Sequence, residues 1–257
     1  MKDVSTEQIA ACLRSLGLKA GDGVMMHTAL QFLGKPRNGL ADYCEAFCQV
    51  LSIDLEDESR SLGTLAVPVF NFGFAKGEPY DPKTTPSVGM GALAEYIRTL
   101  PSAKRTTHPM QSFAIIGAHA EDITRCDTLG AFDAGSAFER MLDLDFKLLL
   151  LGADIQAVSA VHYCEQRANV PYRYWKDFSG KILINGTWET RTYRMFVRDL
   201  QLDPHLKFYP IQKLLEERGQ WKAERLNYGF ISVCRLQDFI KAGDDILREN
   251  VNALMGN

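Results

Sequence analysis

The sequence predicts a single α/β domain over residues 1–257, with a central mixed β-sheet flanked by helices and antiparallel strands added in the C-terminal third. Short apolar runs alternate with helical patterns over residues 1–170, which is typical of helices that cover a central sheet. An Asn-Gly pair at 185–186 lies between β-prone runs and predicts a hairpin. No Pro-, Gly- or Ser-rich linker divides the chain, and its length is compatible with one domain.

The first expected element is a short amphipathic helix. Ser5 and Gln8 fit a capping box, apolar side chains recur at helical spacing over 9–16, and Gly17 ends the run. Buried strands are then expected at 24–27, 64–70, 112–117 and 146–152. Helices are expected from about residue 39, over 91–100 and over 155–168.

The last third is expected to extend the sheet. The hairpin signal over 182–188 predicts antiparallel strands that join it, so a mixed sheet is favoured over a purely parallel one. A strand-like run at 228–233 and a final helix from Leu236 follow, without a predicted path.

The composition limits the classes of partner. With 29 Lys+Arg against 32 Asp+Glu, the net charge is −3, and nucleic-acid binding usually requires a basic surplus. The N-terminus lacks the apolar stretch of a signal peptide, and no window is long and apolar enough to span a bilayer. We therefore expect a cytoplasmic protein without a nucleic-acid or membrane partner.

Neither cysteines nor histidines suggest a metal site or a disulfide framework. The six cysteines form no C-x-x-C pair and are expected to be free thiols, most of them buried. The five histidines show no H-x-H or H-x-x-x-H spacing, so no metal is expected.

One histidine stands out on the helix expected at 155–168. On a helical wheel its small apolar residues form a stripe, and His162 lies about 140° from Ala157, away from that stripe. Ser159 and Glu165 lie one turn on either side of His162. This helix follows a strand, so its start should lie at the carboxyl edge of the sheet, where α/β proteins bind ligands.

His162 is therefore a candidate general base, with Glu165 orienting its ring or raising its basicity. The alternative is an ordinary surface histidine on the polar face of a helix. A Cys164–His162 nucleophilic pair is disfavoured, because the wheel places Cys164 on the buried stripe.

A second candidate segment is the loop at 104–109. Lys104, Arg105, Thr106 and His108 offer two cations, a hydroxyl and an imidazole, which can meet phosphates by charge and hydrogen bond. The chain has neither a Walker loop nor a G-x-G-x-x-G after a strand. A solvated basic loop is the alternative.

Taken together, these motifs resemble the aminoglycoside 3-N-acetyltransferase family, also called the antibiotic acetyltransferase family. The matching segments run in order over about residues 5–175. They are His27-Thr28-Ala29-Leu30, Gly63-Thr64-Leu65-Ala66-Val67-Pro68, Tyr80-Asp81-Pro82, Arg105-Thr106-Thr107-His108-Pro109-Met110-Gln111-Ser112-Phe113, Leu149-Leu150-Leu151-Gly152, and Ser159-Ala160-Val161-His162-Tyr163-Cys164-Glu165.

The resemblance implies acetyl transfer from acetyl-coenzyme A (acetyl-CoA) to an amine of a small, sugar-like acceptor, without a metal. It implies that His162 is the general base, and that Glu165 and Ser159 belong to the catalytic group. The residues expected to hold the coenzyme are His27, Thr28, Ala29, Leu30, Lys104, Arg105, Thr106, His108 and Ser112.

The chain departs from the family in its charge. Residues 163–225 contain 12 Lys+Arg and 8 Asp+Glu, and Arg191, Arg194 and Arg198 lie where drug-modifying members tend to offer carboxylates to the acceptor. Polycationic aminoglycosides favour an acidic cleft. Tyr172, Tyr174, Trp175 and Phe178 are candidates for stacking on a sugar or base.

These departures suggest an amino sugar as acceptor, with a nucleotide-linked amino sugar as the hypothesis and an aminoglycoside antibiotic as the alternative. Two further alternatives belong to other classes: a thioester hydrolase that uses Cys164, and a binding module that holds coenzyme A without turnover.

Overall fold

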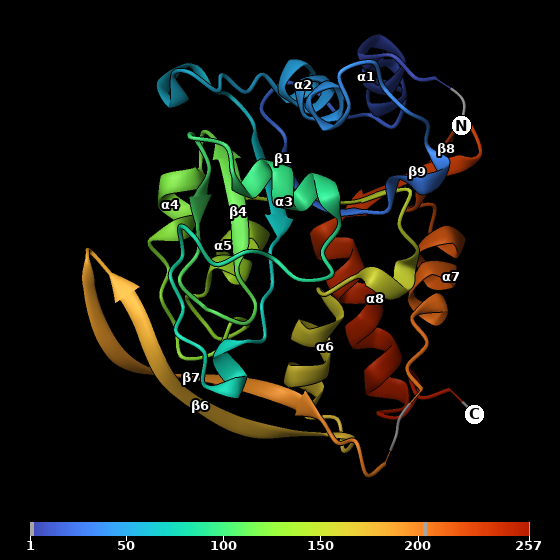
Figure 1. Cartoon of the computed structure of the whole chain (residues 1–257). Helices are drawn as coiled ribbons and strands as arrows, with labels where there is room; N and C mark the ends of the chain where they lie inside the picture. The colour runs from blue at the N-terminus through green and yellow to red at the C-terminus, as the bar shows by residue number, and fades with distance from the viewer. Residues whose placement is uncertain (1–2, 203–204, 257) are drawn as a thin grey trace.

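The computed structural model describes residues 3–202 and 205–256. Within these ranges a seven-stranded sheet has the order β3-β4-β2-β1-β5-β9-β8 (Figure 1). The central strands β2 (Thr64–Pro68), β1 (Gly23–Thr28) and β5 (Lys147–Leu151) are parallel. Antiparallel strands flank them, namely β4 (Phe113–Gly117), β3 (Lys104–Arg105), β9 (Gly229–Arg235) and β8 (Lys222–Leu226). The predicted mixed sheet is confirmed.

Helices cover both faces of this sheet, because successive side chains of a strand point to opposite faces. Val24 and Met26 pack with α1 (Thr6–Ser15), α2 (Leu40–Leu51) and α3 (Ala92–Arg98). Met25 packs on the other face, whose cluster includes side chains of five further helices. These are α4 (Ala120–Thr124), α5 (Ala137–Asp143), α6 (Val161–Ala168), α7 (Tyr209–Glu217) and α8 (Leu236–Glu249). In Figure 1, α1 and α2 lie at the top of the molecule and α6 and α8 in its lower half.

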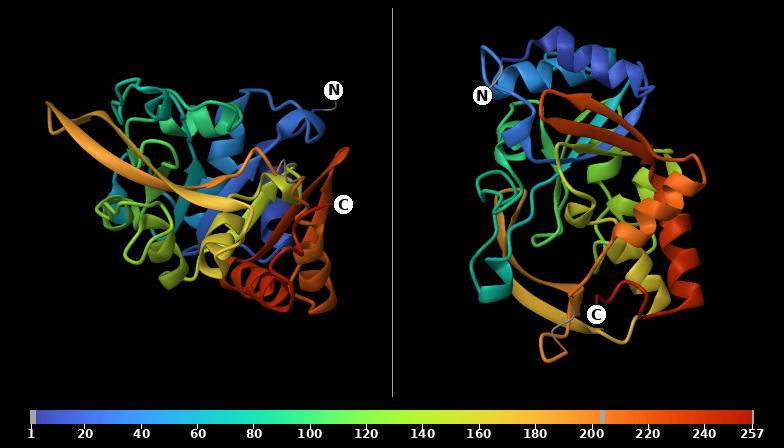
Figure 2. Two further views of the ribbon diagram at one scale, coloured as in Figure 1. Left: turned by 90° about the horizontal axis from the view of Figure 1, so that it is seen from below. Right: turned by 90° about the vertical axis from the view of Figure 1, so that its right-hand side faces the viewer.

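The hairpin signal is correct in position, but the expectation that this hairpin joins the central sheet is wrong. Strands β6 (Arg173–Ile184) and β7 (Thr187–Arg198) form a separate two-stranded sheet, seen as a long curved ribbon in Figures 1 and 2. The edges of the central sheet are formed by β3 and β8 instead. Ile182 and Tyr193 of the hairpin are buried in a small apolar cluster with Phe74, Tyr80 and Met110.

The helix expected over 155–168 is also shorter than the sequence suggests. Ile155–Ala157 form a 3-10 turn, Val158 is extended with ψ 108°, and α6 begins only at Val161. The wheel drawn from Ala157 therefore does not apply. The predicted i, i+3 relation between His162 and Glu165 is still correct, because both residues lie within α6.

The remaining short elements are the 3-10 turns Leu30–Phe32, Glu58–Arg60 and Phe74–Lys76. In the part of the chain that the structure describes, no helix is long and apolar enough to cross a membrane.

Candidate active site

The site lies where the carboxyl ends of β1 and β5 meet the start of α6. These strands are parallel, so their carboxyl ends share one edge of the sheet, where ligands of α/β proteins bind. On β1, His27 is two residues from Met25 and therefore points to the same face, which α6 covers.

A cavity of about 590 Å³ opens at this edge. His27, Phe70, Met90 and Gln111 come from the central sheet and its loops. Ser159 precedes α6, His162 lies in its first turn, and the hairpin provides the opposite wall. The hairpin residues are Arg173, Phe178, Met195, Phe196, Val197 and Arg198. The described lining contains two arginines and no Asp or Glu.

His162, Glu165 and Arg173 form one network in this cavity. The His162 Nδ1 atom lies 2.8 Å from Glu165 Oε2, and Arg173 Nε lies 2.9 Å from the same oxygen. Arg173 Nη2 lies 3.2 Å from His162 Nδ1, and Arg173 Nη1 donates to the Phe196 carbonyl at 3.1 Å. The Glu165 side chain is fully buried, whereas 30% of the His162 side chain is exposed.

The charge of this network explains how Glu165 stays ionised. Burial alone raises the pKa of Glu165, but the hydrogen bond and charge of His162 and the charge of Arg173 outweigh burial and lower it. An ionised Glu165 can only accept, so it pairs with an N–H at Nδ1 of His162, and the 3.2 Å contact of Arg173 Nη2 with that nitrogen is then not a hydrogen bond, because arginine can only donate. The second ring nitrogen, Nε2, then keeps its lone pair and can accept a proton.

His27 and Ser159 complete the wall beside His162. The Ser159 backbone N–H donates to His27 Nε2 at 3.4 Å, and both residues are buried. Burial and the nearby His162 lower the pKa of His27 to about 4. The Ser159 hydroxyl is buried and has no hydrogen-bond partner among the described residues.

The basic loop expected to hold phosphates does not reach this cavity. Lys104 forms ion pairs with Glu58 at 2.6 Å and Glu121 at 2.8 Å. Arg105 donates to the carbonyl oxygens of Val69 and Thr85 and to the hydroxyl of Ser112. Both cations therefore already have ion-pair or hydrogen-bond partners within the protein.

The other residues of that loop are also bound internally. Thr106 accepts a hydrogen bond from the Phe113 N–H, and Ser112 donates to the Val69 carbonyl. His108 is buried, and its Nε2 atom lies 3.3 Å from the carbonyl oxygen of Arg194 on the hairpin. This geometry gives the segment a structural role, connecting the central sheet to β7.

Thr28, Ala29 and Leu30 lie at the end of β1, next to the cavity but outside its lining. The Thr28 hydroxyl is buried and finds no hydrogen-bond partner within the described ranges. Gly91 approaches it closely: a Cβ at this position, where φ is +89°, would lie 2.7 Å from Thr28 Oγ1.

Cys164 lies on the buried side of α6, as the sequence indicates. Its side chain is fully buried, its thiol lies 3.6 Å from the carbonyl oxygen of Ile240, and burial raises its pKa well above the usual value. It does not line the cavity, which argues against a nucleophilic role.

Sequence reasoning missed the role of Arg173. Glu165 could have indicated that such a cation exists, because a carboxylate buried in a protein needs a cationic or hydrogen-bonding partner. Of the four aromatic residues expected to stack on a ligand, only Phe178 lines the cavity. Tyr172 is fully buried, and Tyr174 and Trp175 are exposed outside it.

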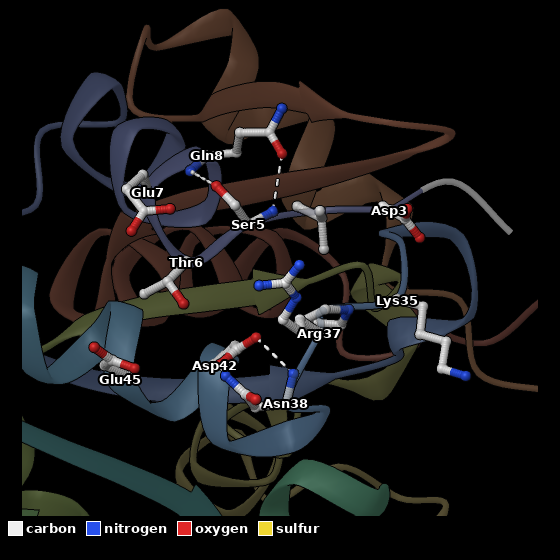
Figure 3. A pocket seen from close by; sticks show the side chains of 12 residues that line it. Asp3, Ser5, Thr6, Glu7, Gln8, Lys35, Arg37, Asn38, Asp42 and Glu45 are labelled. Atoms are coloured by element: carbon white, nitrogen blue, oxygen red, sulfur yellow. Dashed lines mark hydrogen bonds between the residues drawn. The ribbon is translucent and has the colours of Figure 1, made fainter.

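A second, larger hollow of about 870 Å³ lies between the start of α1 and the segment before α2 (Figure 3). Its charged side chains carry both signs, and Asp42 accepts hydrogen bonds from Asn38. No histidine is among its described lining residues. No group of three or more His, Cys, Asp or Glu within 3–202 and 205–256 could hold a metal ion.

Comparison with known proteins identifies the family. A sequence model of the aminoglycoside 3-N-acetyltransferases matches residues 25–248. Aminoglycoside N(3)-acetyltransferase III of Salmonella sp is 31% identical over 195 residues, which cover 71% of this chain and 68% of that protein. The chain belongs to the aminoglycoside 3-N-acetyltransferase family.

Solved structures share its fold. Aminoglycoside acetyltransferase AAC(3)-Xa aligns with a TM-score of 0.83 and 23% identity, over 98% of this chain and 94% of that one. AAC-IIIb in a binary complex with CoASH aligns with a TM-score of 0.82 and 20% identity, over 96% and 97% of the two chains. The chain is an acetyl-CoA-dependent N-acetyltransferase, which confirms the enzyme class and co-substrate expected from the sequence.

Proposed function

We propose that this enzyme acetylates an amine of an amino sugar by direct transfer, with His162 as the general base. The observation that carries the proposal is the buried Glu165 carboxylate, which lies 2.8 Å from His162 Nδ1 in a cavity that the imidazole lines. Glu165 holds the ring, and Arg173 balances the buried charge of Glu165.

In the reaction, the amine nitrogen attacks the carbonyl carbon of the thioester while His162 Nε2 removes a proton from the nitrogen. The tetrahedral intermediate collapses, the carbon–sulfur bond breaks, and the thiolate of coenzyme A leaves. The imidazolium returns its proton to that sulfur. The products are an acetamide and free coenzyme A, and no covalent enzyme intermediate forms.

For acetyl-CoA, the wall formed by the central sheet is the proposed binding surface. His27 lines this wall, and Thr28 lies at its edge. Ala29 and Leu30 continue this edge. Lys104, Arg105, Thr106, His108 and Ser112 are left out of this proposal because each has partners within the protein.

The acceptor is proposed to lie against the hairpin wall and to carry an anionic group. Arg198 is exposed there, and no ion pair to its side chain is found among the described residues. A polycation would meet Arg198 and no lining carboxylate, whereas a nucleotide-linked amino sugar would place a phosphate near Arg198. The names of the relatives favour a second candidate acceptor, an aminoglycoside.

The test is incubation with acetyl-CoA and a panel of UDP-linked amino sugars and aminoglycosides, followed by mass spectrometry. We expect the mass gain of one acetyl group on an amino sugar. Gain on aminoglycosides alone would refute the anionic acceptor. Protein that becomes acetylated with acetyl-CoA alone would support a Cys164 intermediate and contradict direct transfer.

Replacing the base separates an enzyme from a binding module. His162→Ala should lower kcat by about 10²- to 10⁴-fold, the range that a positioned base contributes, while the affinity for coenzyme A stays close to that of the wild type. The matched control is His119→Ala, which removes a histidine outside the cavity, before α4. Unchanged turnover in His162→Ala would remove the proposed base.

A further inference from the structure

The second histidine of the cavity, His27, has no role in the proposed proton transfer. Its side chain is 5% exposed, and it lines the same cavity as His162. Its backbone belongs to the central strand β1, which fixes its position. A rigid strand holds a polar group more accurately than a loop does.

The protonation of His27 is set by its surroundings. The Ser159 N–H donates to Nε2, so Nε2 is the acceptor of the neutral ring and the proton is on Nδ1. No acceptor for Nδ1 is found within residues 3–202 and 205–256. Because burial and His162 lower its pKa to about 4, the ring is neutral near pH 7.

A neutral imidazole of this kind is unsuited to act as a base, because its one lone pair already accepts a hydrogen bond. Its Nδ1–H is suited to donate a hydrogen bond. A neutral N–H in a buried site polarises a carbonyl group without giving up its proton, and a preorganised donor costs no reorganisation when negative charge develops.

We propose that the Nδ1–H of His27 donates a hydrogen bond to the carbonyl oxygen of the acetyl thioester and to the oxyanion that forms from it. This inference rests on the proposed function, in which His162 removes the proton of the amine. When the nitrogen attacks, the carbonyl π electrons move to the oxygen, and this hydrogen bond shortens. The electrons return when the carbon–sulfur bond breaks, and the His27 proton stays on Nδ1 throughout.

The proposal divides the work between two histidines of one cavity. His162, held by an ionised Glu165, takes the proton, whereas His27, held by a backbone N–H, stabilises the negative charge. Because neither ring performs the task of the other, they should respond differently to substitution.

The first test measures the bound carbonyl group directly and needs no acceptor. Isotope-edited infrared spectra of acetyl-CoA labelled with ¹³C at the carbonyl are recorded free and bound to the full-length enzyme. We expect binding to lower the carbonyl stretching frequency in the wild type and in His162→Ala. In His27→Leu, which cannot donate, the frequency should return towards that of the free thioester.

The second test compares donors at position 27. His27→Asn keeps an N–H donor close to the position of Nδ1, and His27→Leu removes it. Loss of one oxyanion donor typically lowers kcat about 10²- to 10³-fold, so we expect that loss in His27→Leu and a partial recovery in His27→Asn. The KM for acetyl-CoA should rise only slightly in His27→Leu, because the hydrogen bond to the ground-state carbonyl is weaker than the one to the oxyanion. Affinity for coenzyme A, which lacks the carbonyl, serves as the control for folding.

Two results would overturn the inference: an unshifted carbonyl band in the wild type, or His27→Leu and His27→Asn with equal kcat. The wild-type spectrum decides the matter even if neither variant folds. If His162→Ala retained full activity but the band still shifted through His27, the proposed base would fail and the oxyanion donor would stand.

Discussion

At the scale of single residues, the site depends on a carboxylate that water does not reach. Glu165 is fully buried, and His162 and Arg173 share its Oε2 atom. An ion pair in this position contributes little to stability in itself, but removal of one partner leaves a buried charge. Its proposed value to the enzyme is that it fixes the tautomer of His162.

Glu165→Gln tests this assignment. The amide cannot hold Nδ1–H with a charge, and it leaves Arg173 buried without a counter-ion, so we expect kcat to fall by roughly 10²-fold while KM for acetyl-CoA changes little. Steady-state kinetics measure both constants. Glu216→Gln on the exposed side of α7 is the matched control. Equal kcat values in the two variants would contradict the role of Glu165.

The sequence predicted the pairing of His162 with Glu165 because both residues lie within a single helix, where geometry follows from the residue numbers. It could not identify the partners of Arg105. Apart from the Ser112 hydroxyl, those partners include the backbone carbonyls of Val69 and Thr85 on distant segments, and backbone atoms leave no mark in a sequence. The sequence alone does not distinguish an arginine or lysine with a structural role from one that binds phosphate.

At the scale of elements, the hairpin β6–β7 is the part of the site that lies outside the central sheet. Its two strands pair with each other, and isolated bridges join them to the rest of the described chain, Tyr80 with Ile182 and Gly130 with Arg194. Its far part also packs in the small cluster that contains Ile182 and Tyr193. Phe178, Met195 and Arg198 on the same hairpin line the cavity. The position of the hairpin wall, where the acceptor is proposed to bind, thus depends on the packing of Ile182 and Tyr193, which lie outside the cavity lining.

Ile182→Ala should loosen that wall. Ile182 is fully buried against Phe74 and Tyr80, and truncation of such a side chain typically costs about 2 to 5 kcal/mol. We expect faster amide hydrogen exchange in residues 173–198 and a raised KM for the acceptor, with KM for acetyl-CoA nearly unchanged. Thr190→Ala, at an exposed position of the same hairpin, is the control. An equal rise in both KM values would show that the hairpin does not act on the acceptor alone.

The strands were predictable as elements, but their arrangement was not. Apolar runs and the Asn-Gly turn located β1, β2, β4, β5 and the hairpin. Which strand occupies an edge depends on contacts between distant residues, such as Leu149 of β5 with Val233 of β9. The fold class follows from the pattern, whereas the topology requires the structure.

At the scale of the whole molecule, two buried neutral histidines make stability depend on pH. Burial lowers the pKa values of His27 and His108 to about 4, below the value of about 6.5 in an unfolded chain. Between these values the unfolded state binds more protons than the folded state. The free energy of unfolding therefore falls as pH decreases from about 6.5 to about 4, and levels off below that for these two groups.

The expected size of the effect is about 1.4 kcal/mol per histidine for each pH unit within that window. Urea unfolding of the wild type and His108→Gln at pH 7 and pH 5 measures it. The variant should lose less stability than the wild type between the two pH values. His119→Gln is the control, and it should match the wild type. An equal pH dependence in His108→Gln would show that His108 is not held neutral.

The separate hairpin has a consequence for how such an enzyme diversifies. The two histidines proposed to act on the reacting atoms belong to the central sheet and α6, and the surface proposed to meet the acceptor belongs to residues 174–198, whereas Arg173 of β6 supports Glu165. Exchange of side chains along β7 would change which amine the enzyme binds, while His27, His162 and Glu165 stay the same. Relatives with the same fold can therefore differ in what they modify and still share how they modify it.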